Sequence, residues 1–249
     1  MERWVGALLL ALVATPGLAE IKVDGRIDEP EWQAAPVLSG FMTTEPYTRG
    51  QPELATQVRV LATDDGLHIG FACDQPPSVE RVRTIGQRDQ FVPGDRVNAM
   101  IDFDGSGTTA YEFSVLLGGA QQDAVISRQV TYNYDWDGDW SYAVSESDGQ
   151  WFVEYRIPWS IAPLGDATDG HRTMGVFFSR VVTKTGRRYS FPGNAFNRAT
   201  FVSDMHKLEV AAHSQAQLDL FPYGAVAHDV LAPDTGTRAG LDLVWKPNG

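Results

Sequence analysis

Apolar and polar residues alternate along much of the chain, in short runs that turn residues separate. The clearest case lies within 94–119, where 97–103 carries apolar side chains at every second position and 111–117 resumes that pattern after an Asp-Gly-Ser-Gly turn. A period of two is typical of a strand with one buried face. The stretch therefore predicts two long antiparallel strands joined by a polar turn, and other strands must cover their apolar face.

The same alternation returns on both sides of this hairpin. It predicts further hairpins over 58–73, 140–157 and 174–191, and a last strand over 202–210. Between the first two hairpins, 78–95 is polar and irregular and predicts a loop. No segment has the length and period of a helix that would cover a parallel sheet. The sequence therefore predicts an all-β fold, a two-sheet antiparallel β-sandwich of the immunoglobulin-like or jelly-roll kind.

The segment that begins at residue 20 is expected to open the sandwich. Ile21 and Val23 suggest a short edge strand. Asp28 is a candidate N-cap for a short helix, because Pro30 follows it at an early helical position. On such a helix, Trp32 would reach the core.

The first nineteen residues have the pattern of a secretory signal peptide. Arg3 precedes an apolar run over 5–14, and the small residues of 17–19 suit cleavage after Ala19. The run is too short to span a bilayer as a helix. A buried N-terminal helix is the alternative, whereas the signal peptide predicts an exported protein.

The tail differs in character from the rest of the chain. Apolar residues alternate over 218–226 and again over 241–245, in segments about ten residues long. That length and period are typical of strands in an outer-membrane barrel, so 213–249 is interpreted as the start of a truncated outer-membrane β-barrel after a sandwich over 20–212. Edge strands of the sandwich are the alternative. With the signal peptide over 1–19, this arrangement predicts a location in the periplasm or outer membrane of a Gram-negative bacterium.

Composition narrows the range of partners. The chain has 249 residues, of which 43% are hydrophobic, enough to bury a full core. Its formal net charge of −12 argues against a nucleic-acid partner, which needs a basic surface. Neutral sugars, calcium and protein partners stay open. Cys73 is the only cysteine, so no intrachain disulfide can form, and its place in a strand predicts a buried thiol.

One loop concentrates acids and aromatic rings. Asp135, Asp137 and Asp139 in DWDGDW offer oxygen ligands close together, which a hard cation such as calcium prefers. The spacing departs from that of an EF-hand, and a solvated polar loop is the alternative. Trp140 begins a strand and is expected to point inward, so Trp136 is the more exposed ring.

The sequence does not indicate an enzyme. Asp102 and Glu112 lie on the central hairpin, but their spacing does not place them on two sides of a glycosidic bond. The chain has no G-x-S-x-G or H-E-x-x-H motif, and its five histidines lack ligand spacing. A glycoside hydrolase is the weak alternative to a non-catalytic protein.

Several short segments, taken in order, resemble a known family. They are VDGRIDEPEW at 23–32, then GLHIGFACDQ, DRVNAMIDF and TAYEFSV, and finally DGQWFVEYRIPWS at 148–160. Over 20–210 the chain resembles a family 9 carbohydrate-binding module. The tail segments LDLFPYG and AGLDLVWKPNG are similar to those of bacterial proteins in which this module precedes an outer-membrane β-barrel of unknown role.

The resemblance implies an immunoglobulin-like sandwich, non-catalytic sugar binding and structural calcium. Modules of this family clamp a terminal sugar between two aromatic faces and fix its hydroxyls with polar side chains. By position, Phe91 falls near the first aromatic residue, and Phe196 or Phe201 near the second. The family's acidic residue and arginine on two central strands correspond to Asn98 and Ser114, so two charged partners of the sugar are lost.

A binding function follows as the leading hypothesis. The candidate ligand-binding residues are Phe91, Asn98, Ser114, Trp136, Phe196 and Phe201. We predict a non-catalytic carbohydrate-binding module of an exported, outer-membrane-associated bacterial protein linked to carbohydrate catabolism. The alternative is a soluble domain that packs on or gates its own barrel and binds no sugar.

Overall fold

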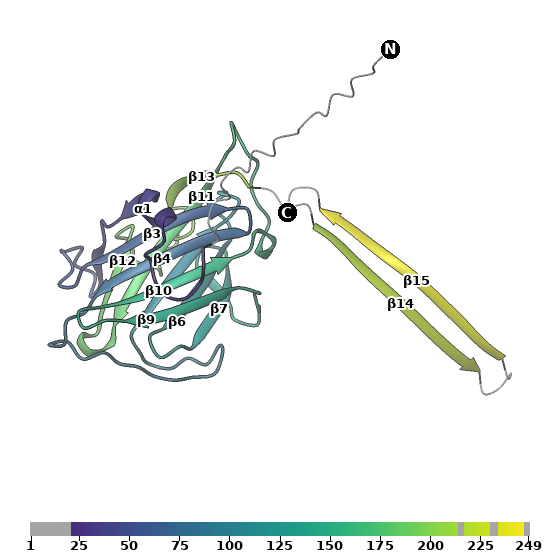
Figure 1. The fold of residues 1–249 in the computed structure, drawn as a ribbon, viewed down its shortest axis with the longest axis horizontal. Coiled ribbons are helices and arrows are strands. Elements are labelled where there is room, and N and C mark those ends of the chain that lie inside the picture. Colours follow the sequence, from purple (N-terminus) through teal and green to yellow (C-terminus); the bar gives the residue numbers. More distant parts are fainter. Residues whose placement is uncertain (1–20, 214–216, 230–233, 247–249) are drawn as a thin grey trace, which may run out of the picture.

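The computed structural model describes residues 21–213, 217–229 and 234–246, so the expected signal peptide lies outside the described residues. Two antiparallel sheets stack face to face (Figure 1). The smaller sheet has the order β1-β3-β4-β10-β9. Its strands are β1 (Val37–Leu38), β3 (Thr56–Thr63), β4 (Gly66–Asp74), β10 (Gln150–Ile157) and β9 (Ser141–Glu146).

The larger sheet has the order β2-β12-β11-β5-β6-β7-β8, and β13 also pairs with β11. Its strands are β2 (Met42–Glu45), β12 (Arg187–Phe191), β11 (His171–Val182), β5 (Arg96–Asp102), β6 (Ala110–Leu116), β7 (Gln121–Ser127), β8 (Thr131–Asn133) and β13 (His206–Ala211). The helical elements are short: α1 (Pro30–Ala34), η1 (Trp159–Ile161) and η2 (Thr183–Thr185). The predicted all-β sandwich and its four main hairpins are confirmed.

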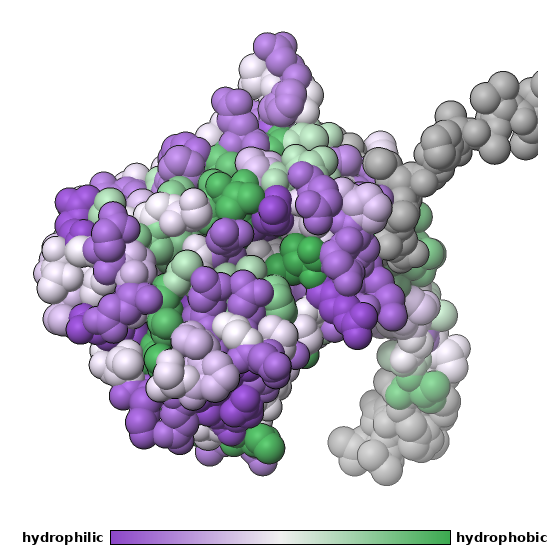
Figure 2. Space-filling model, turned by 60° about the vertical axis from the view of Figure 1, so that its left-hand side comes forward, coloured by the Kyte–Doolittle hydropathy of each residue, from purple (hydrophilic) through white to green (hydrophobic). Residues whose placement is uncertain are grey.

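The core lies between the two sheets, where the apolar residues that alternate along the strands face each other. Val97 and Ile101 of β5 face Phe71 and Tyr155 of the smaller sheet, and all four side chains are fully buried. Cys73 of β4 is also fully buried, as predicted, and burial raises the pKa of its thiol to about 12. On the face shown in Figure 2, hydrophilic residues cover most of the sandwich and hydrophobic ones form small patches.

The outer face of the larger sheet carries a second, smaller apolar cluster. Met100 and Phe177 belong to the sheet, and Phe201, Val202 and Met205 come from the segment 192–205 that follows β12. This segment therefore covers part of the outer face. The predicted strand over 202–210 begins only at His206, because the chain first turns to bury Val202 and Met205.

Some local predictions need correction. Ile21 and Val23 form no strand, and the N-cap of α1 is Glu29 rather than Asp28. Trp32 is fully buried, as expected. The strands β1, β2, β7 and β8 are not indicated by the sequence pattern. In β7 both faces are covered, since Ile126 is buried on the outer face and Asp123 on the inner side, so no alternation of apolar and polar residues results.

The tail forms a hairpin of its own, β14 (Gln217–Asp229) with β15 (Asp234–Lys246), as Figure 1 shows. Within the described residues β14 pairs only with β15, which argues against edge strands of the sandwich. The large apolar side chains of the hairpin are exposed: Leu218, Leu220, Phe221, Tyr223, Val226, Leu241, Leu243, Val244 and Trp245. Among the described residues, none of the helices has the length and hydrophobicity needed to cross a membrane.

The chain before α1 crosses the outer face of the smaller sheet and is held there by Glu154 of β10. The carboxylate of Glu154 accepts hydrogen bonds from the backbone N–H groups of Asp24 at 3.0 Å and Gly25 at 3.1 Å. Gly25 has φ +83°, and a Cβ there would lie 2.8 Å from the backbone of Val144, so glycine is required. Burial raises the pKa of Glu154 to about 7, although the two N–H groups lower it.

Glu154→Gln is expected to reduce the pH dependence of stability. Because the folded pKa lies above the unfolded value, the protonated carboxyl stabilises the fold fully below about pH 4.3, and this contribution is lost as pH rises through about 7. The free energy of unfolding, measured in urea at pH 5 and pH 8, should decline by roughly 3 kcal/mol less in the variant than in the wild type. Glu146→Gln is the matched control, since ion pairing lowers the pKa of Glu146. An equal decline in Glu154→Gln and wild type would contradict the assignment.

Candidate functional site

A cavity of about 570 Å³ opens on the outer face of the larger sheet. Its floor comes from alternate residues of β5 and β6, where Asn98 lies opposite Ser114 and Met100 opposite Glu112 in the strand register. Their neighbours in sequence point into the core, so the same two strands supply both the core and the floor. The predicted residues Asn98 and Ser114 are thus brought together in one place.

The floor is polar, and its groups bond to one another. Ser114 Oγ donates to Glu112 Oε1 at 2.9 Å, and the amide nitrogen of Asn98 donates to Ser114 Oγ at 2.8 Å. The amide oxygen of Asn98 accepts from Ser179 Oγ at 2.9 Å and from Arg188 Nη1 at 3.1 Å. Asn98 and Ser114 are each 2% exposed. They therefore form a fixed floor rather than free partners for a ligand.

Aromatic rings form the walls of the cavity. Phe91 comes from the loop before β5 and is 75% exposed, and Phe196 comes from the segment after β12. An arginine accompanies each ring: the guanidinium carbon of Arg96 lies 5.6 Å from the Phe91 centroid, and that of Arg188 lies 4.5 Å from the Phe196 centroid. The stacked rings of Tyr132 and Tyr134 add a further aromatic surface.

Two of the predicted aromatic residues lie elsewhere. Phe201 is 1% exposed and packs edge-on against Phe177, with ring centroids 4.9 Å apart, so it presents no face to a ligand. This corrects its assignment as a binding residue. Trp136 is half-buried and contacts Tyr111 and Phe113 edge-on at 5.1 and 6.1 Å, and it does not line the cavity. Trp140 is buried in the core, as expected.

Comparison with known proteins identifies the family of the chain. The model of the family described as "Carbohydrate family 9 binding domain-like" matches residues 23–191, more than half of the chain. The chain belongs to this family. A search of curated protein sequences gives no significant match.

Two solved structures of a carbohydrate binding module family 9 from Caldicellulosiruptor kristjanssonii share the fold. The one in complex with cellotriose has a TM-score of 0.53 and 12% identity, and the match covers 78% of this chain and 91% of that chain. The one in complex with glucose has a TM-score of 0.53 and 13% identity, over 77% and 91% of the two chains. At such low identity the likeness shows the fold of this family 9 domain, and its ligand has to be argued from its own residues.

Two titratable groups in the cavity of the family 9 domain have pKa values that burial shifts. Burial raises the pKa of the Glu112 carboxyl, against the hydrogen bond from Ser114 and the positive charges of Arg188 and Arg96. Burial also lowers the pKa of Arg96, and the like charge of Arg188 adds to that effect. Sequence reasoning did not select Glu112, Arg96 or Arg188 as binding residues. The period of two could have indicated Arg96 and Glu112, which share the outward phase of Asn98 and Ser114.

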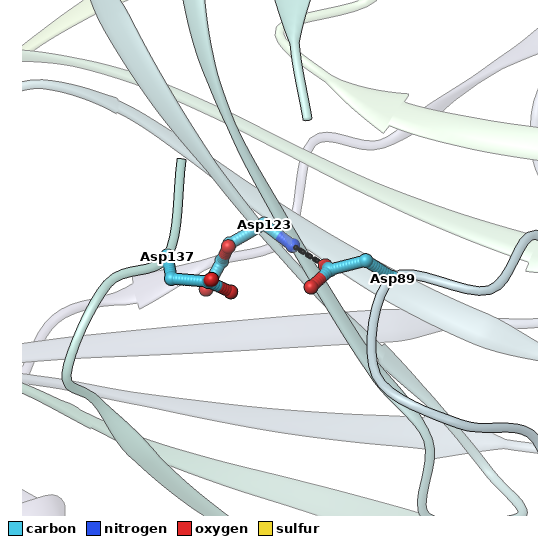
Figure 3. A group of neighbouring side chains, drawn as sticks. All are labelled: Asp89, Asp123 and Asp137. Carbon is cyan, nitrogen blue, oxygen red and sulfur yellow. Dashed lines mark hydrogen bonds between the residues drawn. The ribbon is translucent and has the colours of Figure 1, made fainter. Parts of the chain in front are cut away.

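A cluster of three carboxylates lies beside this cavity. Asp89, Asp123 and Asp137 each offer an oxygen within 4.8 Å of the others, and their side chains point toward one another in Figure 3. The N–H of Asp123 donates to Asp89 Oδ1 at 3.0 Å. Asp123 is fully buried; its Oδ2 accepts from Trp140 Nε1 at 2.6 Å, and its Oδ1 has no hydrogen-bond partner.

Arg88 supplies positive charge to this cluster. Its Nη2 lies 2.5 Å from Asp123 Oδ2, and its Nε lies 3.1 Å from Asp137 Oδ1 and 3.4 Å from Asp89 Oδ2. Among the described residues the expected trio of Asp135, Asp137 and Asp139 does not converge: all three are exposed, and only Asp137 joins the cluster. Asp89 and Asp123 lie far from the DWDGDW motif in sequence, so its spacing does not reveal them.

The oxygen donors of the cluster suit calcium in kind. The backbone carbonyl of Gly138, which accepts from Arg88 Nη2 at 2.8 Å, is a further oxygen nearby. A cation at Asp89, Asp123 and Asp137 would compete with the Arg88 guanidinium for the same oxygens. Its positive charge would hold together the three segments of chain that carry these carboxylates.

Two other arrangements are less suited to a ligand. A cavity of about 730 Å³ is lined by Arg81, Arg83 and Glu146, but both arginines are already paired with the Glu146 carboxylate, at 2.9 and 2.5 Å. For hydrolysis, Asp102 and Glu112 would have to face each other across one cavity. Asp102 is fully buried, pairs with Lys207 at 3.3 Å and does not line the cavity that Glu112 lines.

Replacing Phe196 and Phe201 by alanine should show which of the two is a core residue and which belongs to the cavity wall. Phe201→Ala is expected to lower the free energy of unfolding by about 3 kcal/mol or more, because it leaves a void against Phe177. Phe196→Ala should lower it by only about 1 kcal/mol, since its half-buried ring contacts Arg188 and the edge of the second apolar cluster without being enclosed. Urea unfolding of both variants checks this. Equal losses would mean that Phe196 is a core residue too.

Proposed function

We propose that this family 9 domain is a non-catalytic carbohydrate-binding module whose sugar sits in the cavity walled by Phe91 and Phe196. The observation that carries the proposal is a cavity with a polar floor and two aromatic walls, the exposed ring of Phe91 and the half-buried ring of Phe196. Sugars present C–H faces that stack on aromatic rings and hydroxyls that need positioned polar partners. Asp102 and Glu112 do not share the cavity, which favours binding over hydrolysis.

Phe91→Ala tests the proposal most directly. Oligosaccharides that bind the protein are first identified on a glycan array, and their affinity is then measured by isothermal titration calorimetry. The variant should bind about tenfold more weakly, since stacking on one ring contributes on the order of 1 kcal/mol or more. Ile85→Ala is the matched control, because Ile85 is 84% exposed in the same loop and does not line the cavity. Unchanged affinity in Phe91→Ala, or no binding on the array, would contradict the proposal.

The cellular setting extends the proposal. We infer that the module is exported and tethered to an outer membrane by a barrel that begins with β14 and β15, and that it serves carbohydrate catabolism. The signal-like N-terminal pattern and the exposed apolar side chains of the 13-residue strands support this. In the alternative, the domain packs on or gates its own barrel, and it then binds no glycan.

Calcium is proposed as a structural ligand of Asp89, Asp123 and Asp137, in competition with Arg88. Calcium should raise the melting temperature of Arg88→Gln more than that of the wild type, because the variant frees the three carboxylates. The double variant Arg88→Gln/Asp137→Asn is the control and should respond least. Differential scanning fluorimetry with calcium and with EDTA measures the shift. No calcium response in Arg88→Gln would refute the assignment.

A further inference from the structure

One guanidinium in the cavity is left without a partner. Arg96 is half-buried on β5 and lines the cavity, yet among the described residues it has no hydrogen-bond or ion-pair partner. Its ring contact is with Phe91, at 5.6 Å. Other arginines of the same region are matched: Arg81 and Arg83 with Glu146, and Arg88 with the acidic cluster. In a protein of net charge −12, an unmatched arginine in a cavity calls for an explanation.

No other charge of the cavity forms an ion pair with Arg96 among the described residues, and the carboxylate of Glu112 attracts it only at longer range. Arg188 is paired with Glu45 at 3.2 Å, and Asp89 lies 3.4 Å from Arg88. Glu112 forms no ion pair within 4.0 Å of either cavity arginine in the described structure, and its carboxylate accepts from Ser114. Burial disfavours the charged forms of both Glu112 and Arg96, yet arginine stays protonated in proteins. The cavity thus holds an available positive charge with several free N–H donors.

We infer that the ligand of this cavity is an acidic saccharide, whose carboxylate or sulfate group pairs with Arg96 while its ring lies among the aromatic walls. This inference rests on the proposed function and names its substrate class. A guanidinium matches an oxyanion with two parallel N–H···O bonds. Stacking beside Phe91 orients the planar group before the ligand arrives, which reduces the entropy lost on binding.

Calorimetric titrations with a matched pair of ligands test the inference. The pair is trigalacturonate and its fully methyl-esterified form, which share the same sugar backbone and differ only in whether each carboxyl group is a charged carboxylate or a neutral methyl ester. Cellotriose is the unrelated neutral ligand, and a sulfated galactan oligosaccharide distinguishes sulfate from carboxylate. We expect the wild type to bind at least one anionic ligand about tenfold or more tightly than the neutral ones. The preference should weaken with added salt.

Variants at Arg96 assign the preference to this side chain. Arg96→Gln should remove the preference for the acid over the ester, and Arg96→Lys should keep part of it, because the lysine retains charge but not the planar fork. Arg26→Gln is the control with the same change in net charge: Arg26 is exposed in the segment that crosses the smaller sheet and does not line the cavity. Thermal melts of each variant check folding. If Arg96→Gln does not fold, the comparison of acid with ester in the wild type and in Arg96→Lys decides.

The outcomes separate the two proposals. Equal affinity for acid and ester, or an Arg96→Gln variant that keeps the preference, would overturn the acidic ligand and leave neutral sugar binding in place. Binding of cellotriose and of no acidic ligand would likewise overturn the acidic ligand and leave neutral sugar binding in place. Absence of binding to every saccharide would overturn the proposed function and the inference together. Preference for the sulfated ligand over trigalacturonate would identify the oxyanion as sulfate and support the acidic class.

Discussion

Strands β5 and β6 lie in the middle of the larger sheet, and both of their faces are used. One face closes the core with Val97, Ile101 and Phe113, and the other forms the cavity floor with Asn98 and Ser114. Polar groups so deeply placed are costly unless they are hydrogen-bonded, which explains why the floor bonds to itself through Ser179 and Glu112. The floor therefore keeps its shape through its own hydrogen bonds.

Most arginines near the cavity form ion pairs with carboxylates. The cluster of Asp89, Asp123 and Asp137 contains Arg88, and Glu146 contacts both Arg81 and Arg83. The exposed pairs, such as Arg83 with Glu146, contribute little to stability, but together these ion pairs occupy most of the arginines near the cavity. The unpaired guanidinium of Arg96 therefore stands out by comparison with its neighbours rather than by its residue type. Because Arg96 lies beside the aromatic ring of Phe91 in the cavity wall, its lack of an ion pair bears on ligand binding.

Much of the fold could be predicted from alternation, because a strand with one buried face leaves a period of two in the sequence. The pattern fails at β7, where Ile126 and Asp123 are buried on opposite sides. The site was only partly predictable: Phe91 and Phe196 follow from a resemblance in order along the chain, but nothing in the sequence separates a half-buried Phe196, which lines the cavity, from a fully buried Phe201. Contacts between segments that are distant in sequence, such as Asp89 in the loop before β5 with Asp123 of β7, leave no local pattern at all.

Asp89 belongs both to the acidic cluster and to the lining of the cavity. The stability of the loop that carries Asp89 therefore affects ligand binding in the cavity. The N–H of Asp89 donates to the carbonyl of Gln121, and its carboxylate accepts from the N–H of Asp123. Phe91 lies two residues further along the same loop. A ring that is 75% exposed has few contacts of its own to hold it in place, so its position depends on the anchor at Asp89. Arg88 pairs with the carboxylates of the cluster and thereby supports the loop that carries this wall of the cavity.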